Sequence, residues 1–422
     1  MKRILSLLLL IPMLLTFFSL PTNAAEPDTQ YAESTLLYCF HTDTVLYEKD
    51  AEKALAVGNT AQLMTALLTL EAYPDLDVEV TLTPELLPGW YTEGDYRTPA
   101  DYGFTKGATL PVKDLIAAVV IENANCASLF LASLIAGSRD AFTEKMNTRA
   151  KELGMTDTVY QNPTGLDAAG AQTTARDVML LARALYEIPA FTALAASATY
   201  TLSASRFTVY TRNYFIGKWY TAEYVYSRAN GMKAGYTDKA GYTLVATATE
   251  TDGYSYLAIV LGAKEIAFKN TSYGIARSLF TWGSTAFSYR EVLSSAKLVT
   301  TLPVTGGDGV SNVPLFPKEA ISAYLPKAVD SGELTLSYTL RTDSLTAPFE
   351  KGTEVGEVSI SYNGKVIAST ALVTGNAVVR SQNASFRDFA KKVLKWVGIA
   401  LAVLVGISIL RFALRHCKRN ER

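Results

Sequence analysis

AVGNTAQLMTALLTLE, residues 56–71, joins the pattern of a buried helix to an unusual beginning. From Leu63 onward, apolar side chains recur at helical spacing, and the pattern predicts a helix over about 60–72. Its first turn carries two neutral amides, Asn59 and Gln62. Asparagine is a favoured N-cap residue, so one interpretation is that the Asn59 side chain holds the first turn of the helix. The other interpretation is that Asn59 contacts a ligand.

The surrounding residues, about 30–285, alternate strand and helix patterns. Residues 34–50, STLLYCFHTDTVLYEKD, indicate two strands around a polar turn, and Asp252-Gly253 indicates a hairpin between two later apolar runs. Helical patterns lie between them, at about 60–72, 112–120, 125–136, 139–153 and 174–186. Strands at both ends with helices between them favour an α/β (α+β) domain in which helices flank an antiparallel sheet.

A small all-β domain is predicted over 289–378. Short alternating segments such as LTLSYTLR (334–341) and EVSISYNGKVIASTALV (357–373) are typical of strands, and Asn363-Gly364 marks a tight turn. Residues 379–392 are predicted to link this domain to the last segment of the chain.

Both ends of the chain predict targeting segments. Residues 1–25 have basic residues, an apolar run and then small residues, the order of a secretory signal peptide; an uncleaved anchor helix is the alternative. Residues 393–414 are long enough to cross a bilayer if Lys395 and Arg411 reach its two interfaces; a helix on the membrane surface is the alternative. Basic residues flank this span on both sides, so the signal peptide orients it, with the short tail, 415–422, inside.

The composition excludes several classes of function. The 422 residues carry a formal net charge of −1, which gives no indication of a nucleic-acid partner. The three cysteines are far apart and the two histidines stand alone, so we expect no disulfide framework, no metal site and no cofactor. Cys39 and Cys126 lie in apolar stretches and are predicted to be buried thiols.

Four stretches of the first domain carry a family resemblance. They are VLYEKDAEKALAVGNTAQLMTALLTLE (45–71), QNPTGLDAAGAQTTARDVMLLARAL (161–185), NGMKAGYTDKAGYTLVATA (230–248) and LAIVLGAK (257–264). In this order they resemble the serine D-alanyl-D-alanine carboxypeptidases, the low-molecular-mass penicillin-binding proteins that trim the last D-alanine from peptidoglycan stem peptides. The resemblance covers about 33–279 and implies a transpeptidase or β-lactamase-like fold, and the β domain and membrane anchor match the family's layout.

The first catalytic motif of that family pairs a serine nucleophile with a lysine base one helical turn later. The resemblance places the serine position at Asn59 and the lysine position at Gln62. An amide nitrogen is a poor nucleophile because its lone pair is delocalised, and glutamine has no basic lone pair near neutral pH. Thr60 is the alternative nucleophile, although a one-residue step turns its side chain by about 100° around the helix.

The second motif, Ser-x-Asn, supplies a proton relay and a substrate-binding amide in the family. It falls on Asn123-Ala124-Asn125, so the serine is replaced by Asn123 while Asn125 is kept. For Asn125 two interpretations stay open: contact with a peptide, or a cap or cross-brace within the helical part of the domain.

The third motif, Lys-Thr-Gly, holds the substrate's terminal carboxylate in the family. It falls on Lys233-Ala234-Gly235, so Ala234 replaces the threonine, while Lys233, Gly235 and the nearby Thr237 remain. Lys233 either still binds a carboxylate or is merely solvated.

Hydroxyl and ammonium chemistry is therefore missing at four positions in three motifs. Loss of one member of a catalytic unit usually removes most of the rate, so the resemblance implies a catalytically degenerate member, a pseudoenzyme. We expect it on the outer face of a bacterial cell membrane, where it binds peptidoglycan stem peptides or a cell-wall enzyme without hydrolysis. A residually active carboxypeptidase with a rewired site and a purely structural scaffold are the alternatives.

Overall fold

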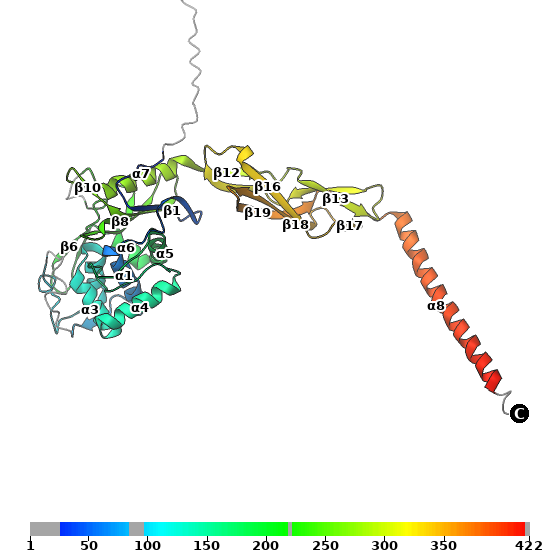
Figure 1. Ribbon diagram of the computed structural model, residues 1–422, viewed down its shortest axis with the longest axis horizontal. Helices are drawn as coiled ribbons and strands as arrows, with labels where there is room; N and C mark the ends of the chain where they lie inside the picture. The colour runs from blue at the N-terminus through cyan, green and yellow to red at the C-terminus, as the bar shows by residue number, and fades with distance from the viewer. Residues whose placement is uncertain (1–25, 84–96, 218–221, 418–422) are drawn as a thin grey trace, which may run out of the picture. The chain divides into compact units, whose positions relative to one another are not determined.

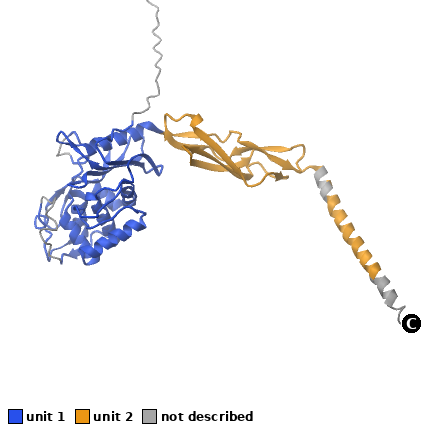
Figure 2. Cartoon of the chain, in the orientation of Figure 1, with its two compact units in different colours: residues 1–287 blue, residues 288–422 orange. Residues whose placement is uncertain are grey.

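The computed structural model describes residues 26–83, 97–217 and 222–417, which form two compact units (Figure 1). The first unit ends at Phe287 and the second begins at Ser288 (Figure 2). The expected signal peptide, 1–25, and residues 418–422 of the expected tail lie outside the described residues.

A five-stranded sheet forms the centre of the first unit, with the strand order β2-β1-β9-β8-β7 and antiparallel pairing throughout. The predicted hairpins are confirmed: a turn after Cys39 joins β1 to β2, and Asp252-Gly253 lies between β8 and β9. The strands are β1 (Ser34–Cys39), β2 (Thr44–Lys49), β7 (Ala229–Thr237), β8 (Gly241–Thr249) and β9 (Ser255–Ala263). Strand β7 lies at one edge of the sheet, so one of its sides has no neighbouring strand in that sheet.

The sheet separates two hydrophobic cores. In β1, Leu36 and Tyr38 belong to one core, and Leu37 and Cys39 belong to the other, because successive side chains of a strand point to opposite faces. Helices α1–α6 contribute to the first core and α7 to the second. These helices are α1 (Ala61–Ala72), α2 (Val112–Ala117), α3 (Asn125–Ala136), α4 (Arg139–Glu152), α5 (Ala175–Tyr186), α6 (Pro189–Ala195) and α7 (Thr271–Ala286). The predicted antiparallel sheet flanked by helices is confirmed.

Four of the predicted helices agree with the structure to within one residue at each end, and one does not. The pattern over 112–120 is an α-helix only as far as Ala117; a π-helical turn, η3 (Ala118–Glu122), follows and ends at Asn123. Helices α6 and α7 were not predicted. Short strand pairs complete the unit: β3 (Glu79–Thr81) with β4 (Thr109–Pro111), β5 (Thr199–Thr201) with β6 (Thr208–Tyr210), and β10 (Glu265–Ile266) with β11 (Lys269–Asn270).

The second unit begins with a β domain around its own small core, which includes Leu302, Leu315, Val358 and Leu372. Its main sheet has the order β16-β18-β19-β14-β13-β17. Asn363-Gly364, both at positive φ, form the predicted turn between β18 and β19. The strands of the domain are β12 (Phe287–Leu293), β13 (Thr300–Thr305), β14 (Asn312–Pro317), β15 (Ile321–Pro326), β16 (Leu334–Leu340), β17 (Leu345–Thr346), β18 (Glu354–Tyr362) and β19 (Lys365–Thr374).

A long helix, α8 (Gln382–Cys417), ends the described chain. It begins inside the segment expected to be a linker, 379–392. Within it, Phe389–Ile409 spans 21 residues with a mean hydropathy of 1.9, and the segment is long and apolar enough to cross a membrane.

Candidate functional site

The beginning of α1 places Asn59 at the edge of the cleft. A 3-10 turn, η1 (Gly58–Thr60), precedes the helix, and neither η1 nor α1 has a side-chain capping hydrogen bond. The interpretation of Asn59 as an N-cap is therefore wrong, and its Oδ1 is buried without a hydrogen-bond partner. Thr60, the alternative nucleophile, is buried and its hydroxyl donates to the carbonyl of Val57. Thr60 is thus held away from the cleft.

Gln62 connects α1 to the second motif. Its side chain is 1% exposed, and Nε2 donates to the backbone carbonyl of Asn123 at 3.2 Å and to Oδ1 of Asn125 at 3.0 Å. Gln62 Oε1 has no partner. The Gln62 amide thus joins two segments of the fold and offers no group that accepts a proton near neutral pH.

The second motif is shaped by the π-helical turn η3. Asn123, the residue after this turn, has φ 64° and ψ 30°, a left-handed conformation that asparagine tolerates better than most residues. Its Nδ2 donates to the carbonyl oxygen of Ala234 on β7 at 2.8 Å. Asn125 begins α3 and is 4% exposed. Side-chain amides therefore form a continuous bridge from Asn125 through Gln62 and Asn123 to the edge strand.

Lys233 of the third motif points away from the cleft. It is 3% exposed, and its ammonium donates to the carbonyls of Val119 and Val120 in the η3 turn. Burial lowers the pKa of Lys233 well below its ordinary value. No carboxylate oxygen of a described residue lies within salt-bridge distance of this ammonium. The lysine thus holds β7 against the η3 turn.

The close contact between β7 and Asn59 explains why residue 235 is a glycine. A Cβ atom on Gly235 would lie 2.0 Å from Oδ1 of Asn59, so only glycine allows the Asn59 side chain to pack against the strand. Further along, the Thr237 hydroxyl donates to Oδ1 of Asp167 at 2.8 Å. This bond attaches the end of β7 to the loop that contains Asp167.

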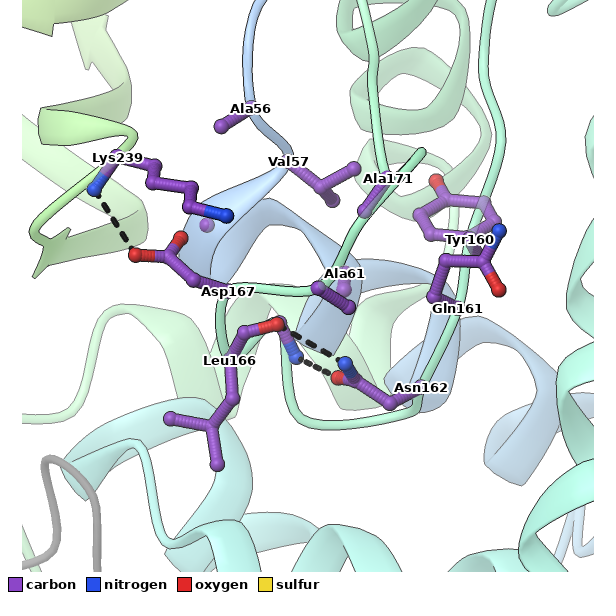
Figure 3. A pocket seen from close by; sticks show the side chains of 13 residues that line it. Ala56, Val57, Ala61, Tyr160, Gln161, Asn162, Leu166, Asp167, Ala171 and Lys239 are labelled. Carbon is purple, nitrogen blue, oxygen red and sulfur yellow. Dashed lines mark hydrogen bonds between the residues drawn. The ribbon is translucent and has the colours of Figure 1, made fainter.

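That loop turns at Asn162–Gly165, where Oδ1 of Asn162 accepts hydrogen bonds from the backbone N–H groups of Thr164 and Gly165. Gly165 has φ 81°, and a Cβ there would lie 1.9 Å from the carbonyl oxygen of Gly58, so the loop packs directly on the start of η1. Asn162 donates to the carbonyl of Leu166, and the backbone of Lys239 donates to Asp167, each at 2.9 Å (Figure 3). The cavity behind this loop measures about 30 Å³, which suits a water molecule rather than a ligand.

A larger cavity of about 200 Å³ lies where the three motifs meet. Among the predicted site residues, Asn59, Asn123, Asn125, Ala234, Gly235 and Thr237 line it, whereas Gln62 and Lys233 do not. The sequence did not identify the rest of the wall, which is rich in tyrosine and includes Glu122, Arg212, Tyr214, Tyr236, Tyr242, Asn270 and Tyr273. The cleft is therefore polar and aromatic, and it keeps a ligand-sized space.

Glu122 and Arg212 provide charge in this wall. Arg212 Nη2 lies 3.2 Å from Oε1 of Glu122, and Arg97 Nε lies 3.4 Å from the same oxygen. Burial raises the pKa of Glu122, and the two guanidinium groups partly oppose this effect. Within the described ranges, no three His, Cys, Asp or Glu side chains are placed to hold a metal ion.

The fold and the cleft define the class of protein. An antiparallel sheet between two helical layers, with a cleft between an edge strand, a helix start and a polar turn, is the transpeptidase or β-lactamase-like fold. The chain belongs to the D-alanyl-D-alanine carboxypeptidase family, whose model matches residues 21–265. Residues 287–380 match the model of the C-terminal domain of penicillin-binding protein 5.

Individual relatives agree with this family along most of the chain. The D-alanyl-D-alanine carboxypeptidase DacC of Escherichia coli (strain K12) is 32% identical over 365 residues, 85% of this chain and 88% of DacC. DacF of Bacillus subtilis (strain 168) is 28% identical over 407 residues, 93% of this chain and 98% of DacF. The structure of penicillin binding protein 5 from Haemophilus influenzae has a TM-score of 0.58 and 24% identity, covering 83% of this chain and 98% of that chain.

Proposed function

We propose that this protein is a non-catalytic, membrane-anchored member of its family that binds peptidoglycan stem peptides without cutting them. One observation carries the proposal: the residue at the family's base position, Gln62, is buried and hydrogen-bonded as a structural bridge. Acylation needs a nucleophile and a group that removes its proton, and neither Asn59 nor Gln62 supplies such a group.

The remaining substitutions support the same conclusion. Asn123 has no hydroxyl to relay a proton, and its amide is engaged with the Ala234 carbonyl. Ala234 itself has no hydroxyl to orient a substrate. Because the members of a catalytic unit act together, four such losses leave no route by the family's mechanism.

Binding, in contrast, is supported by the space that remains. The cavity keeps about 200 Å³ and contains amide, charged and aromatic side chains, the types that recognise a polar peptide. Gly235 and Gly165 still allow the close backbone approaches that shape it. A cell-wall enzyme is the other partner that we consider for the same surface.

We place the protein at the outer face of a bacterial membrane. The proposal includes a cleaved signal peptide over 1–25, a spanning segment within 393–414 and a basic tail at 415–422 on the inner side. The apolar stretch Phe389–Ile409 of α8 supports this topology. The proposed domains are 30–285 and 289–378, joined to the membrane by 379–392.

Labelling with a fluorescent penicillin tests the loss of catalysis. We expect membranes that contain the full-length protein to form no covalent adduct, because acylation requires a serine oxygen. The positive control combines Asn59→Ser, Gln62→Lys, Asn123→Ser and Ala234→Thr, and we expect this variant to be labelled. An adduct on the parent protein that disappears in Thr60→Ala would contradict the proposal and favour a rewired enzyme.

Retention on purified peptidoglycan tests the binding function. We expect the detergent-solubilised protein to be retained, and free stem peptide to elute it. Retention no greater than that of an unrelated membrane protein would overturn peptide binding and leave the structural scaffold as the remaining function.

A further inference from the structure

Strand β16 of the second unit is a sheet edge without the usual protection. It stands at one end of the main sheet, and among the described residues no strand pairs with its outer side. Free edges in native proteins are usually short, bulged or interrupted by charged residues or proline, because a free edge otherwise pairs with another strand. Strand β16 has seven residues, LTLSYTL, without charge, proline or bulge, whereas the opposite edge strand, β17, has only two residues.

The hydrogen-bond ladder shows which backbone groups of β16 face its open side. The N–H of Arg341, directly after the strand, donates to the carbonyl of Val355 in β18. In an antiparallel pair, alternate residues bond to the same neighbour, so Ser337 also bonds toward β18. Leu336 and Tyr338 flank Ser337, and their N–H and C=O groups therefore point outward, where no described strand receives them.

The side chains of these two residues form an exposed apolar row. Leu336 is 37% exposed and Tyr338 is 43% exposed. Leu334 and Leu340, at the two ends of the strand, pack against the core of the β domain. Alternate side chains of a strand share one face, so all four lie on the core side of the sheet. The middle of this row thus lacks a cover.

Strand β16 is complementary to a second copy of itself. In an antiparallel pair with a two-fold axis at Ser337, Leu336 of each copy lies opposite Tyr338 of the other. These are the residues whose backbone groups face outward, so the two edges can exchange hydrogen bonds. The same pairing sets an aliphatic side chain beside an aromatic one twice, a combination that stabilises sheets.

Charge selects this register over its neighbours. With the axis at Ser337, Glu333, directly before the strand, lies beside Arg341 of the other copy at both ends of the pair. Arg341 is exposed and has no ion-pair partner among the described residues. An axis at Tyr338 would instead place Glu333 beside Asp343, so that two acids repel each other.

We propose that β16 joins two copies of this protein edge to edge, as a symmetric dimer in which Glu333 of each copy pairs with Arg341 of the other. The dimer continues the main sheet across the two-fold axis and covers the apolar row. The inference is independent of the ligand of the cleft, because none of these residues lines that cavity.

Disulfide cross-linking in membranes tests the register. In Ser337→Cys the two thiols meet at the axis, where facing Cα atoms of a pair without mutual hydrogen bonds are about 4.5 Å apart, within disulfide range. Cys417→Ser is included so that no link forms through that residue. After mild oxidation, we expect a product of twice the monomer mass on a non-reducing gel.

Thr335→Cys in the same background is the matched control. Residue 335 shares the strand and the face of Ser337, but its counterpart in the dimer is displaced by four residues, about 13 Å along the strand. We expect little or no linked product. Equal linking of the two variants, or no linking at Ser337→Cys, would overturn the inference. A product of another mass would assign the edge to a different protein and would also overturn it.

Charge reversal tests the ion pairs independently, by sedimentation equilibrium of the full-length protein in detergent. Glu333→Arg places two arginines beside each other at both ends of the dimer, and Arg341→Glu places two glutamates there. We expect each variant to weaken the dimer at least about tenfold, because like charges oppose strand pairing. A parent protein that stays monomeric at all concentrations would contradict the inference.

A mixture of the two variants separates charge from local damage. Glu333 also accepts the backbone N–H of Asp330, so Glu333→Arg removes a capping bond as well as a charge. In the mixture, each copy of one variant meets the opposite charge on the other at both ends, while the capping bond stays lost. We expect dimers to return, and a mixture that remains monomeric would overturn the pairing of Glu333 with Arg341.

Discussion

The body of α1 and the cleft at its beginning are neighbours in the chain, but they satisfy different physical requirements. Leu63 and Met64 are fully buried in the first core, and their side chains are apolar. Asn59, one turn before Leu63, and Gln62, directly before it, bury amide oxygens that have no partner. Packing is thus complete in the helix body, whereas hydrogen bonding is incomplete in the cleft. Buried polar groups without a hydrogen-bond partner are few in folded proteins, so each of them needs a physical explanation.

The largest expected effect lies in the helix body. Leu63→Ala removes a fully buried side chain and leaves a cavity, so we expect the free energy of unfolding of the first unit to fall by about 3 kcal/mol. Urea denaturation of the full chain, followed by circular dichroism, measures the change. Leu298→Ala is the control because Leu298 is 51% exposed, and we expect a change of less than about 0.5 kcal/mol. Similar losses in both variants would contradict the assignment of α1 to the core.

A smaller effect is expected from the buried lysine behind the cleft. Burial lowers the folded-state pKa of Lys233 below 10.5, so between these values the unfolded chain binds more protons than the folded one. The free energy of unfolding therefore rises with pH through this window, by up to about 1.4 kcal/mol per pH unit. Denaturation at a series of pH values measures the slope, and we expect Lys233→Met to remove it. A slope that persists in this variant would assign it to another group.

The smallest effect is expected at Asn59 itself. Its oxygen forms no capping bond, so we expect Asn59→Ala to change the free energy of unfolding by less than about 0.5 kcal/mol. Ser138 is the matched control because its side chain accepts a hydrogen bond from the backbone N–H of Ala141 at the start of α4. We expect Ser138→Ala to cost about 1 kcal/mol. The same denaturation experiment compares them, and a larger loss at Asn59 would restore the capping interpretation.

The sequence predicted helices that carry strong apolar periodicity and missed those that do not. Helix α7 contains Gly274, Gly283 and several serines and threonines, all weak helix formers. Its low helix propensity explains why the sequence did not predict it, and packing of its buried residues stabilises it. Helix α6 begins with Pro189, which is a helix start signal, but it is only seven residues long. So short a segment shows too little apolar periodicity to be distinguished from the surrounding loop pattern. The pattern over 112–120 is periodic, but periodicity cannot distinguish an α-helix from one that widens into a π-helical turn.

The candidate site also contains residues that the sequence identified and residues that it missed. Family motifs located Asn59, Asn123, Asn125 and the β7 residues because those residues are local in sequence. Glu122 and Arg212 are 90 residues apart, so no local sequence pattern predicts that they form an ion pair in the cleft. The hydrogen-bond partners of the Lys233 ammonium could not be predicted from the sequence either. They are the carbonyls of residues more than 110 positions away, which only folding brings close to the lysine.

The sequence by itself determined the class of fold and the two hairpin turns, and it predicted the loss of the nucleophile and base, because each depends on residue identity and short-range spacing. The tertiary structure alone decided that Asn59 caps nothing, that Gln62 and Asn123 link α1 to β7, and that their oxygens remain unpaired. Hydrogen-bond satisfaction is the physical reason for this division. It depends on which groups meet in three dimensions, and the identity of one amide does not reveal its partner.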